Sequence, residues 1–194
     1  KVIGVEPSGA ACMKASLEKG EVVTLPHVNT IADGTAVQTP GEHIFPYLQE
    51  NLDDVITIDD DELIVAFLDM VENHKMIVEN SGLLTVAALR HLNFTGKKVV
   101  SILSGGNMDV ITMSSVVQHG LIQRDRIFTV SVLIPDKPGE LVRVASIIAE
   151  NQGNVIKLDH NQFISTNRYA AVELKVTLEA YGTDHKKKIV KALE

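Results

Sequence analysis

A serine–glycine–glycine–asparagine turn at residues 104–107 is the sequence feature that most constrains the fold. It follows an apolar run at 98–103 that reads as a buried strand, and it precedes a segment at 108–119 that reads as a helix. In α/β folds, a strand, a glycine turn and a helix place a polar group beside a cofactor at the carboxyl ends of the strands. Two glycines let the backbone approach a flat ring closely, so the hydroxyl of Ser104 can meet a ring nitrogen. An ordinary βα turn is the alternative interpretation.

Short apolar strands alternate with helices over the first 119 residues. We expect strands at 2–5, 55–58 and 98–103, and helices at 8–19, 42–51, 59–71, 81–91 and 108–119. This alternation predicts an α/β domain with a doubly wound parallel sheet. The acidic run at 59–62 fits a helix start, where carboxylates bind free N–H groups and complement the helix dipole. A metal site is the alternative for that run.

The pattern changes after a predicted linker at 120–126. We expect strands at 128–134, 155–163 and 169–178, a hairpin turn around 166–167, and helices at 141–151 and 183–193. The order βαββα needs one more strand to complete a ferredoxin-like module. The sequence therefore predicts a second, α+β domain at 127–194 whose last strand is missing.

Composition and charge argue against several classes of function. The formal net charge of −7 argues against a nucleic-acid partner. No apolar run approaches the ~18 residues that a membrane span needs. One cysteine, Cys12, fits a reducing cytoplasm, and the seven histidines show no metal-ligand spacing. Because the chain begins in mid-strand and ends on an uncapped helix, we expect it to be a fragment of a longer protein.

Four blocks in order resemble the second half of pyridoxal-phosphate threonine/serine dehydratases, which have the tryptophan-synthase-β-like fold (fold type II). They lie at residues 2–8, 30–34, 79–82 and 102–107. Residues 128–194 resemble an ACT domain, a small amino-acid-sensing module. The pairing of these two domains is typical of one subgroup of threonine ammonia-lyases.

The first resemblance implies pyridoxal phosphate as cofactor and a 2-oxo acid and ammonia as products from threonine or serine. In that family a lysine holds the cofactor as a Schiff base, but no lysine of this chain lies in the family's motif, so no catalytic residue is assigned. The resemblance implies that Ser104 bonds the pyridine nitrogen, that Gly105 and Asn107 shape the loop, and that Glu79 lies near the ring edge. For Glu79, a helix-start carboxylate is the alternative. A hydroxyl cannot keep the ring nitrogen charged, which suits β-elimination better than transamination.

Some members of the family bind a divalent ion. Its ligands would map to Glu6, the carbonyl of Ala10 and the residue at position 12. That residue is Cys12 here, and hard cations prefer oxygen. We therefore expect no metal.

The second resemblance implies an effector site at the turn 136–141. Its proline and glycine expose backbone N–H groups at a helix start, which suits an amino-acid carboxylate, although a plain turn with a helix cap is the alternative. The implied effector-binding residues are Asp136, Pro138, Gly139, Glu140, Leu141 and Asn154. By analogy the effector is isoleucine or valine, and ACT domains imply a homo-oligomer.

We expect this chain to be the C-terminal portion of a threonine/serine ammonia-lyase that is regulated by amino acids and inactive as a fragment. Both threonine and serine stay open as substrates. A non-catalytic amino-acid sensor is the main alternative. A nucleotide-binding domain is disfavoured because neither G-x-G-x-x-G nor a P-loop is present.

Overall fold

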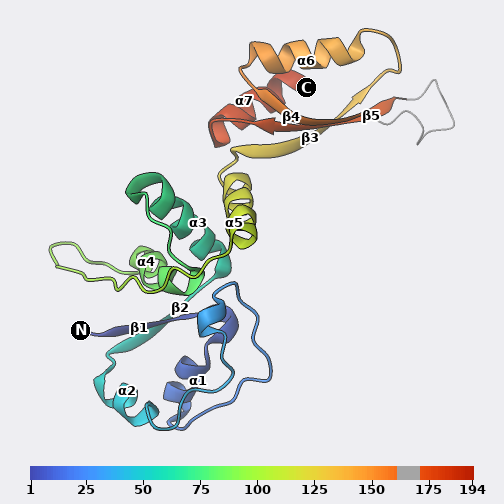
Figure 1. The fold of residues 1–194 in the computed structure, drawn as a ribbon. Helices are drawn as coiled ribbons and strands as arrows, with labels where there is room; N and C mark the ends of the chain where they lie inside the picture. Colours follow the sequence, from blue (N-terminus) through green and yellow to red (C-terminus); the bar gives the residue numbers. More distant parts are fainter. Residues whose placement is uncertain (161–170) are drawn as a thin grey trace. The chain divides into compact units, whose positions relative to one another are not determined.

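The computed structural model describes residues 1–160 and 171–194 (Figure 1). Contacts divide the chain into a first unit, Lys1–Val117, and a second unit, Gln118–Glu194. Each unit has its own buried apolar cluster, so each is described by itself.

The first unit is built on two parallel strands, β1 (Ile3–Pro7) and β2 (Asp54–Ile58) (Figure 1). Its helices are α1 (Cys12–Lys19), α2 (Phe45–Asn51), α3 (Asp60–Asp69), α4 (Leu84–Ala87) and the first part of α5 (Val110–Gln123). A π-helical turn, Met70–His74, extends α3, and 3-10 turns at Asn80–Leu83 and Ala88–His91 flank α4. The sequence placed these elements correctly to within a few residues.

Helix α3 supplies much of the first core. Leu63, Ala66, Phe67 and Met70 are buried as the spacing predicts, whereas Val71 is only half-buried. The acidic run forms the predicted cap: the side chains of Asp59 and Glu62 make a capping box with the backbone.

The second carboxylate of that run, Asp60, has a different function. Asp60 accepts hydrogen bonds from the Thr30 hydroxyl, at 2.6 Å, and from the Ile31 N–H, at 3.0 Å. It thereby fixes the loop before residue 34 to the start of α3.

The predicted strand at 98–103 is wrong. No strand forms there, and Val100 and Ile102 are 88% and 72% exposed. Two hydrogen bonds hold the segment to α4: Ser101 donates to the Thr85 carbonyl, and the Thr85 hydroxyl donates to the Ile102 carbonyl. An apolar run becomes a buried strand only beside another strand, and within the described part of this unit only β1 and β2 are strands. Of the predicted doubly wound sheet, the structure therefore shows two parallel strands.

The second unit has the predicted βαββα order. Its elements are β3 (Ile127–Ile134), α6 (Glu140–Glu150), β4 (Asn154–His160), β5 (Val172–Glu179) and α7 (Thr183–Leu193). The sheet is antiparallel with the order β3-β5-β4. The central strand alternates, burying Leu174, Val176 and Leu178 in a core shared with residues of both helices. The predicted hairpin at 166–167 lies outside the described residues.

Two boundary predictions need correction. Helix α5 begins at Val110 and not at 108, and it continues to Gln123. Residues 120–123 of the predicted linker are therefore helical. Only the last part of that segment turns, with Arg126 N–H donating to the Leu121 carbonyl at 2.8 Å. None of the described helices has both the length and the apolar character of a membrane span.

Burial predicts that truncating one apolar residue of the first unit has a large effect on stability and truncating another has a small one. Phe67→Ala should lower the free energy of unfolding by about 3–5 kcal/mol, because the fully buried ring leaves a cavity. Val100→Ala, in the run predicted as a buried strand, should change it by less than about 0.5 kcal/mol. Urea unfolding followed by circular dichroism measures both. A loss above 1 kcal/mol for the valine would mean that the run is buried after all.

Candidate functional site

The loop 104–107 interlocks with the turn that opens α4. A Cβ atom on Gly82 would lie 1.8 Å from the carbonyl oxygen of Ser104, and one on Gly105 would lie 2.1 Å from Cδ of Glu79. Gly105 also has φ +79°, a conformation that side chains rarely adopt. Glycine at position 82 allows the close approach of the loop backbone, and glycine at position 105 leaves room for the Glu79 side chain.

Hydrogen bonds connect the same two segments. The N–H of Asn107 donates to Oε2 of Glu79 at 3.1 Å, and the N–H of Glu79 reaches the Gly105 carbonyl at 3.5 Å. Glu79 stands at the N-cap of its own 3-10 turn but makes no side-chain cap bond there. Its carboxylate instead accepts a hydrogen bond from the loop. The helix-start alternative predicted a bond to the first turn of its own helix. The side chain of Ser104 is exposed, so its hydroxyl is accessible.

The structure thus brings together Ser104, Gly105, Asn107 and Glu79, the four residues that the resemblance implied. Their binding of a cofactor stays a prediction. What the geometry provides is a hydroxyl, a carboxylate and a glycine backbone within one small region.

Sequence reasoning missed two polar side chains beside this region. The Asn80 amide donates to the Ile31 carbonyl at 3.0 Å, but its Oδ1 is buried without a hydrogen-bond partner. The Ser81 hydroxyl is also buried and unpartnered. A Cβ on Gly34 would lie 2.9 Å from that hydroxyl and 3.6 Å from Oε1 of Glu79. Buried polar atoms normally have partners, so these two oxygens are exceptions among the described residues.

Glu6, which the resemblance implied as a metal ligand in some relatives, has another role in this structure. Both carboxylate oxygens of Glu6 accept backbone N–H groups at the start of α1, from Met13 and Lys14, each at 2.8 Å. Burial, and then the nearby Glu6 charge, raises the pKa of the Cys12 thiol. The described residues contain no cluster of three side chains suited to a metal. Glu6 is a capping carboxylate in this structure.

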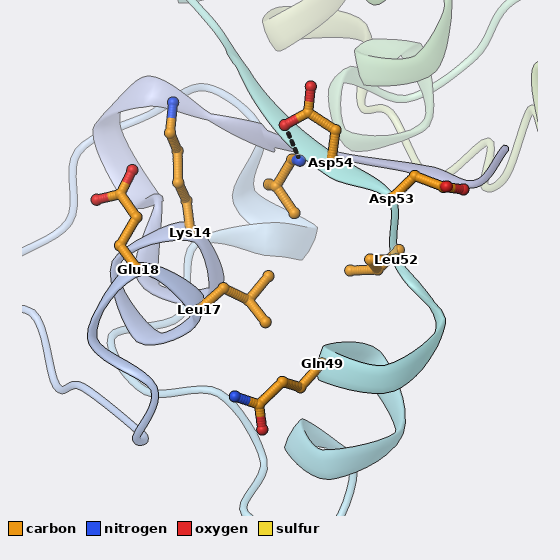
Figure 2. A pocket seen from close by; sticks show the side chains of 8 residues that line it. Lys14, Leu17, Glu18, Gln49, Leu52, Asp53 and Asp54 are labelled. Atoms are coloured by element: carbon orange, nitrogen blue, oxygen red, sulfur yellow. Dashed lines mark hydrogen bonds between the residues drawn. The ribbon is translucent and has the colours of Figure 1, made fainter.

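Figure 2 shows a separate open cleft of about 350 Å³ in the first unit. Lys14, Leu17 and Glu18 of α1 face Gln49 and Leu52 across it, and Asp53, Asp54 and Val55 complete its lining. Two of its carboxylates already bind backbone: that of Asp53 accepts the Val2 N–H at 2.6 Å, and that of Asp54 accepts its neighbour's N–H at 2.8 Å. None of the predicted site residues lines it.

The predicted effector turn lines a cavity of about 350 Å³ in the second unit. Asp136, Pro138, Gly139 and Leu141 line it, together with His160 at the end of β4, which sequence reasoning missed. Gly139 is the N-cap of α6 with φ +95°. Glu140 and Asn154 are absent from the lining.

Asn154 lies at the opposite end of β4 from His160. Six residue steps along the strand separate them, or ~20 Å at about 3.3 Å per residue. The Asn154 side chain donates instead to Glu179 at 3.2 Å. Within one chain, Asn154 therefore does not join the turn.

The interlock predicts that substituting two adjacent glycines changes stability by very different amounts. Gly105→Ala should lower the free energy of unfolding by more than about 1 kcal/mol, because positive φ and the Glu79 side chain both oppose a Cβ. Gly106→Ala is the matched control: a Cβ there meets nothing within 4 Å. Urea unfolding and hydrogen exchange of the Asn107 amide measure the effect. Equal behaviour of the two variants would contradict the interlock.

Comparison with known proteins identifies relatives over the whole chain. L-threonine ammonia-lyase of Geobacter sulfurreducens is 35% identical over 196 aligned positions, which span 100% of this chain and 49% of that protein. The enzyme of the same name from Thermotoga maritima is 31% identical, spanning 100% and 48%. This chain therefore spans about half the length of the relatives that it matches.

Solved structures support the fold. Threonine deaminase isoform 2 from Solanum lycopersicum superposes with a TM-score of 0.56 at 35% identity, covering 61% of this chain and 36% of that one. Maize serine racemase superposes with a TM-score of 0.54 at 33% identity, covering 61% and 40%. The family described as pyridoxal-phosphate dependent enzyme matches residues 1–105. The predicted α/β fold of that family is thereby confirmed, and this chain belongs to the pyridoxal-phosphate-dependent enzymes.

Proposed function

We propose that this chain is part of a pyridoxal-phosphate-dependent threonine ammonia-lyase, which converts threonine or serine to a 2-oxo acid and ammonia. The observation that carries the proposal is the interlock of Glu79 with the loop that presents Ser104. Relatives named L-threonine ammonia-lyase that match the whole chain support it. A cytoplasmic location agrees with the single, buried cysteine.

The residues present fit one edge of the cofactor. The exposed Ser104 hydroxyl can bond a ring nitrogen, and the loop is open at Gly106, where a Cβ would meet nothing within 4 Å. The Ser81 hydroxyl lies near the Glu79 carboxylate, since a Cβ on Gly34 would be 2.9 Å from the one and 3.6 Å from the other. Bound pyridoxal phosphate supplies the electron sink that the elimination needs.

The chemistry of this chain's own residues then favours elimination. A serine hydroxyl is too weak an acid to protonate a pyridine nitrogen fully. Ser104 would therefore hold the ring nitrogen by a hydrogen bond and would not give it a full charge. Glu79, held by the Asn107 N–H, would contribute a negative charge near the ring edge. Both residues would thus favour loss of a β-hydroxyl over transamination.

We further propose that the second unit is an ACT domain that binds an amino-acid effector and pairs with a second copy. The strand order β3-β5-β4 is the ferredoxin-like order without its fourth strand. The cavity at the turn 136–141 supplies backbone N–H groups at the start of α6. Strand β4 is a sheet edge that exposes Val155, Ile156 and Leu158, and such edges favour pairing.

The catalytic part of the proposal is tested at Ser104 in the complete enzyme. Ser104→Ala should lower kcat/KM for threonine at least about tenfold, or ~1.4 kcal/mol of transition-state stabilisation, and should shift the absorption spectrum of the bound cofactor. Ser104→Thr keeps the hydroxyl and should retain most of both. An unchanged rate and spectrum in the alanine variant would place Ser104 away from the ring.

The regulatory part is tested at Gly139. Gly139→Asp adds a carboxylate where the effector carboxylate is expected, and like charges in contact cost several kcal/mol. Calorimetry with isoleucine and valine should show binding to the unaltered chain and none to the variant. Gly20→Asp is the matched control, because Gly20 also has positive φ and open space around it but lies in the first unit. Equal binding by the two variants would exclude this turn as the effector site.

A further inference from the structure

The open cleft between α1 and the end of α2, shown in Figure 2, combines an apolar surface with polar side chains. Leu17, Leu52 and Val55 supply the apolar surface, and Val55 is only 8% exposed. The volume of about 350 Å³ falls at the small end of the range of about 300–1,000 Å³ that is usual for ligand sites. An apolar lining with a few polar groups is also the usual construction of such sites.

Three polar side chains around the cleft have no partner within the described part of the chain. They are the ammonium group of Lys14, the carboxylate of Glu18 and the amide of Gln49, and none of the three forms a side-chain hydrogen bond or ion pair there. The carboxylates of Asp53 and Asp54, by contrast, each accept a backbone N–H. The cleft therefore offers one cation, one anion and one amide to a bound molecule.

The two charges on α1 are arranged against the preference of the helix. Lys14 lies in its first turn and Glu18 in its last turn, whereas the helix dipole favours anions at the start and cations at the end. A lysine four residues before a glutamate is also the weaker order for a pair on one helix face. The start of α1 is already capped by Glu6, so Lys14 is not needed there. Charges that break a local rule in this way are expected at functional sites.

We propose that this cleft binds an α-amino acid whose side chain ends in an amide, of the glutamine type. The ligand carboxylate binds Lys14 and the ligand ammonium binds Glu18, since residues four apart are neighbours on one helix face. The methylene groups of the ligand lie on Leu17 and Leu52. Its amide pairs with that of Gln49, because each of the two amides can donate and accept at once. None of the residues assigned above to the cofactor or the effector lines this cleft, so the inference goes beyond the proposed function and does not rest on it.

The test is a titration of the isotope-labelled chain with L-glutamine, followed by nuclear magnetic resonance of the backbone amides. We expect saturable shifts at residues 14–18 and 49–55. L-Norvaline and L-isoleucine carry no amide and lose two hydrogen bonds to Gln49, so they should bind there about tenfold more weakly or worse. No shift at these amides with glutamine, or equal affinity for glutamine and norvaline, would overturn the proposal. Glutamine shifts confined to residues 136–141 would overturn it in favour of the turn in the second unit.

Lys14→Gln and Glu18→Gln test the two charges. Each removes one ion pair with the ligand and should raise the Kd for glutamine at least about threefold, as expected for partly exposed pairs. Neither variant should unfold more easily, because each removes a charge that the helix dipole disfavours. Lys19→Gln is the matched control, on the same helix but outside the lining, and should leave the Kd unchanged. An unchanged Kd in either of the first two variants, or a raised Kd in the control, would contradict the site.

Gln49→Leu tests recognition of the amide. It should bring the affinity for glutamine down to that for norvaline, so that the ratio of the two falls from about ten to about one. Glu50→Gln, at the neighbouring residue outside the lining, should preserve the ratio. A ratio that survives in Gln49→Leu would show that this amide does not select the ligand.

Discussion

The close packing of Glu79 against the backbone of Gly105 is the contact on which the candidate site depends. It occurs where the loop 104–107 meets the turn that opens α4. Gly82 and Gly105 remove the two Cβ atoms that would keep the segments apart. The carboxylate then accepts the Asn107 N–H. The Ser104 side chain is left facing solvent as a consequence of this packing, without any helix or strand to orient it.

Carboxylates are abundant in the first unit, and their hydrogen bonds separate structural from chemical roles. Glu6 caps α1, Asp59 and Glu62 cap α3, and Asp60 holds the loop at 30–31. Each of these uses at least one oxygen on a backbone or hydroxyl group near a helix start, and Glu62 also contacts Nε2 of His91 at 2.6 Å. Glu79 differs because it does not cap its own turn. Unpaired oxygens lie next to it on Asn80 and Ser81. Charge alone therefore does not identify a site, and the hydrogen-bond partners of each carboxylate have to be compared.

The sequence predicted what depends on neighbours along the chain. The apolar stripe of α3, the capping box at Asp59 and the βαββα order of the second unit follow from local spacing, and all are observed. The meeting of Glu79 with the 104–107 loop followed from the resemblance. Burial of the Asn80 and Ser81 oxygens could not be predicted, because it depends on packing against residues 31–34, about 50 positions away. That His160 lines the cavity at the turn 136–141 depends in the same way on the register of the sheet. The predicted strand at 98–103 was wrong because a strand needs a neighbouring strand to pair with. The composition of the run does not specify that neighbour.

The unpaired 98–103 run bears directly on the site, because Ser104 follows it immediately. In the present structure the loop is fixed on its Glu79 side and, before that, by two hydrogen bonds to Thr85. The side chains between these anchors are largely solvated. Pairing of this run into a sheet would restrict the φ and ψ angles of each residue up to Ser104, at an entropy cost of about 1–2 kcal/mol per residue that strand pairing and apolar burial must offset. Pairing of this run would therefore also restrict the position of the hydroxyl. If Ser104 bonds a ring nitrogen as proposed, the order of the segment before it matters as much as the glycines after it.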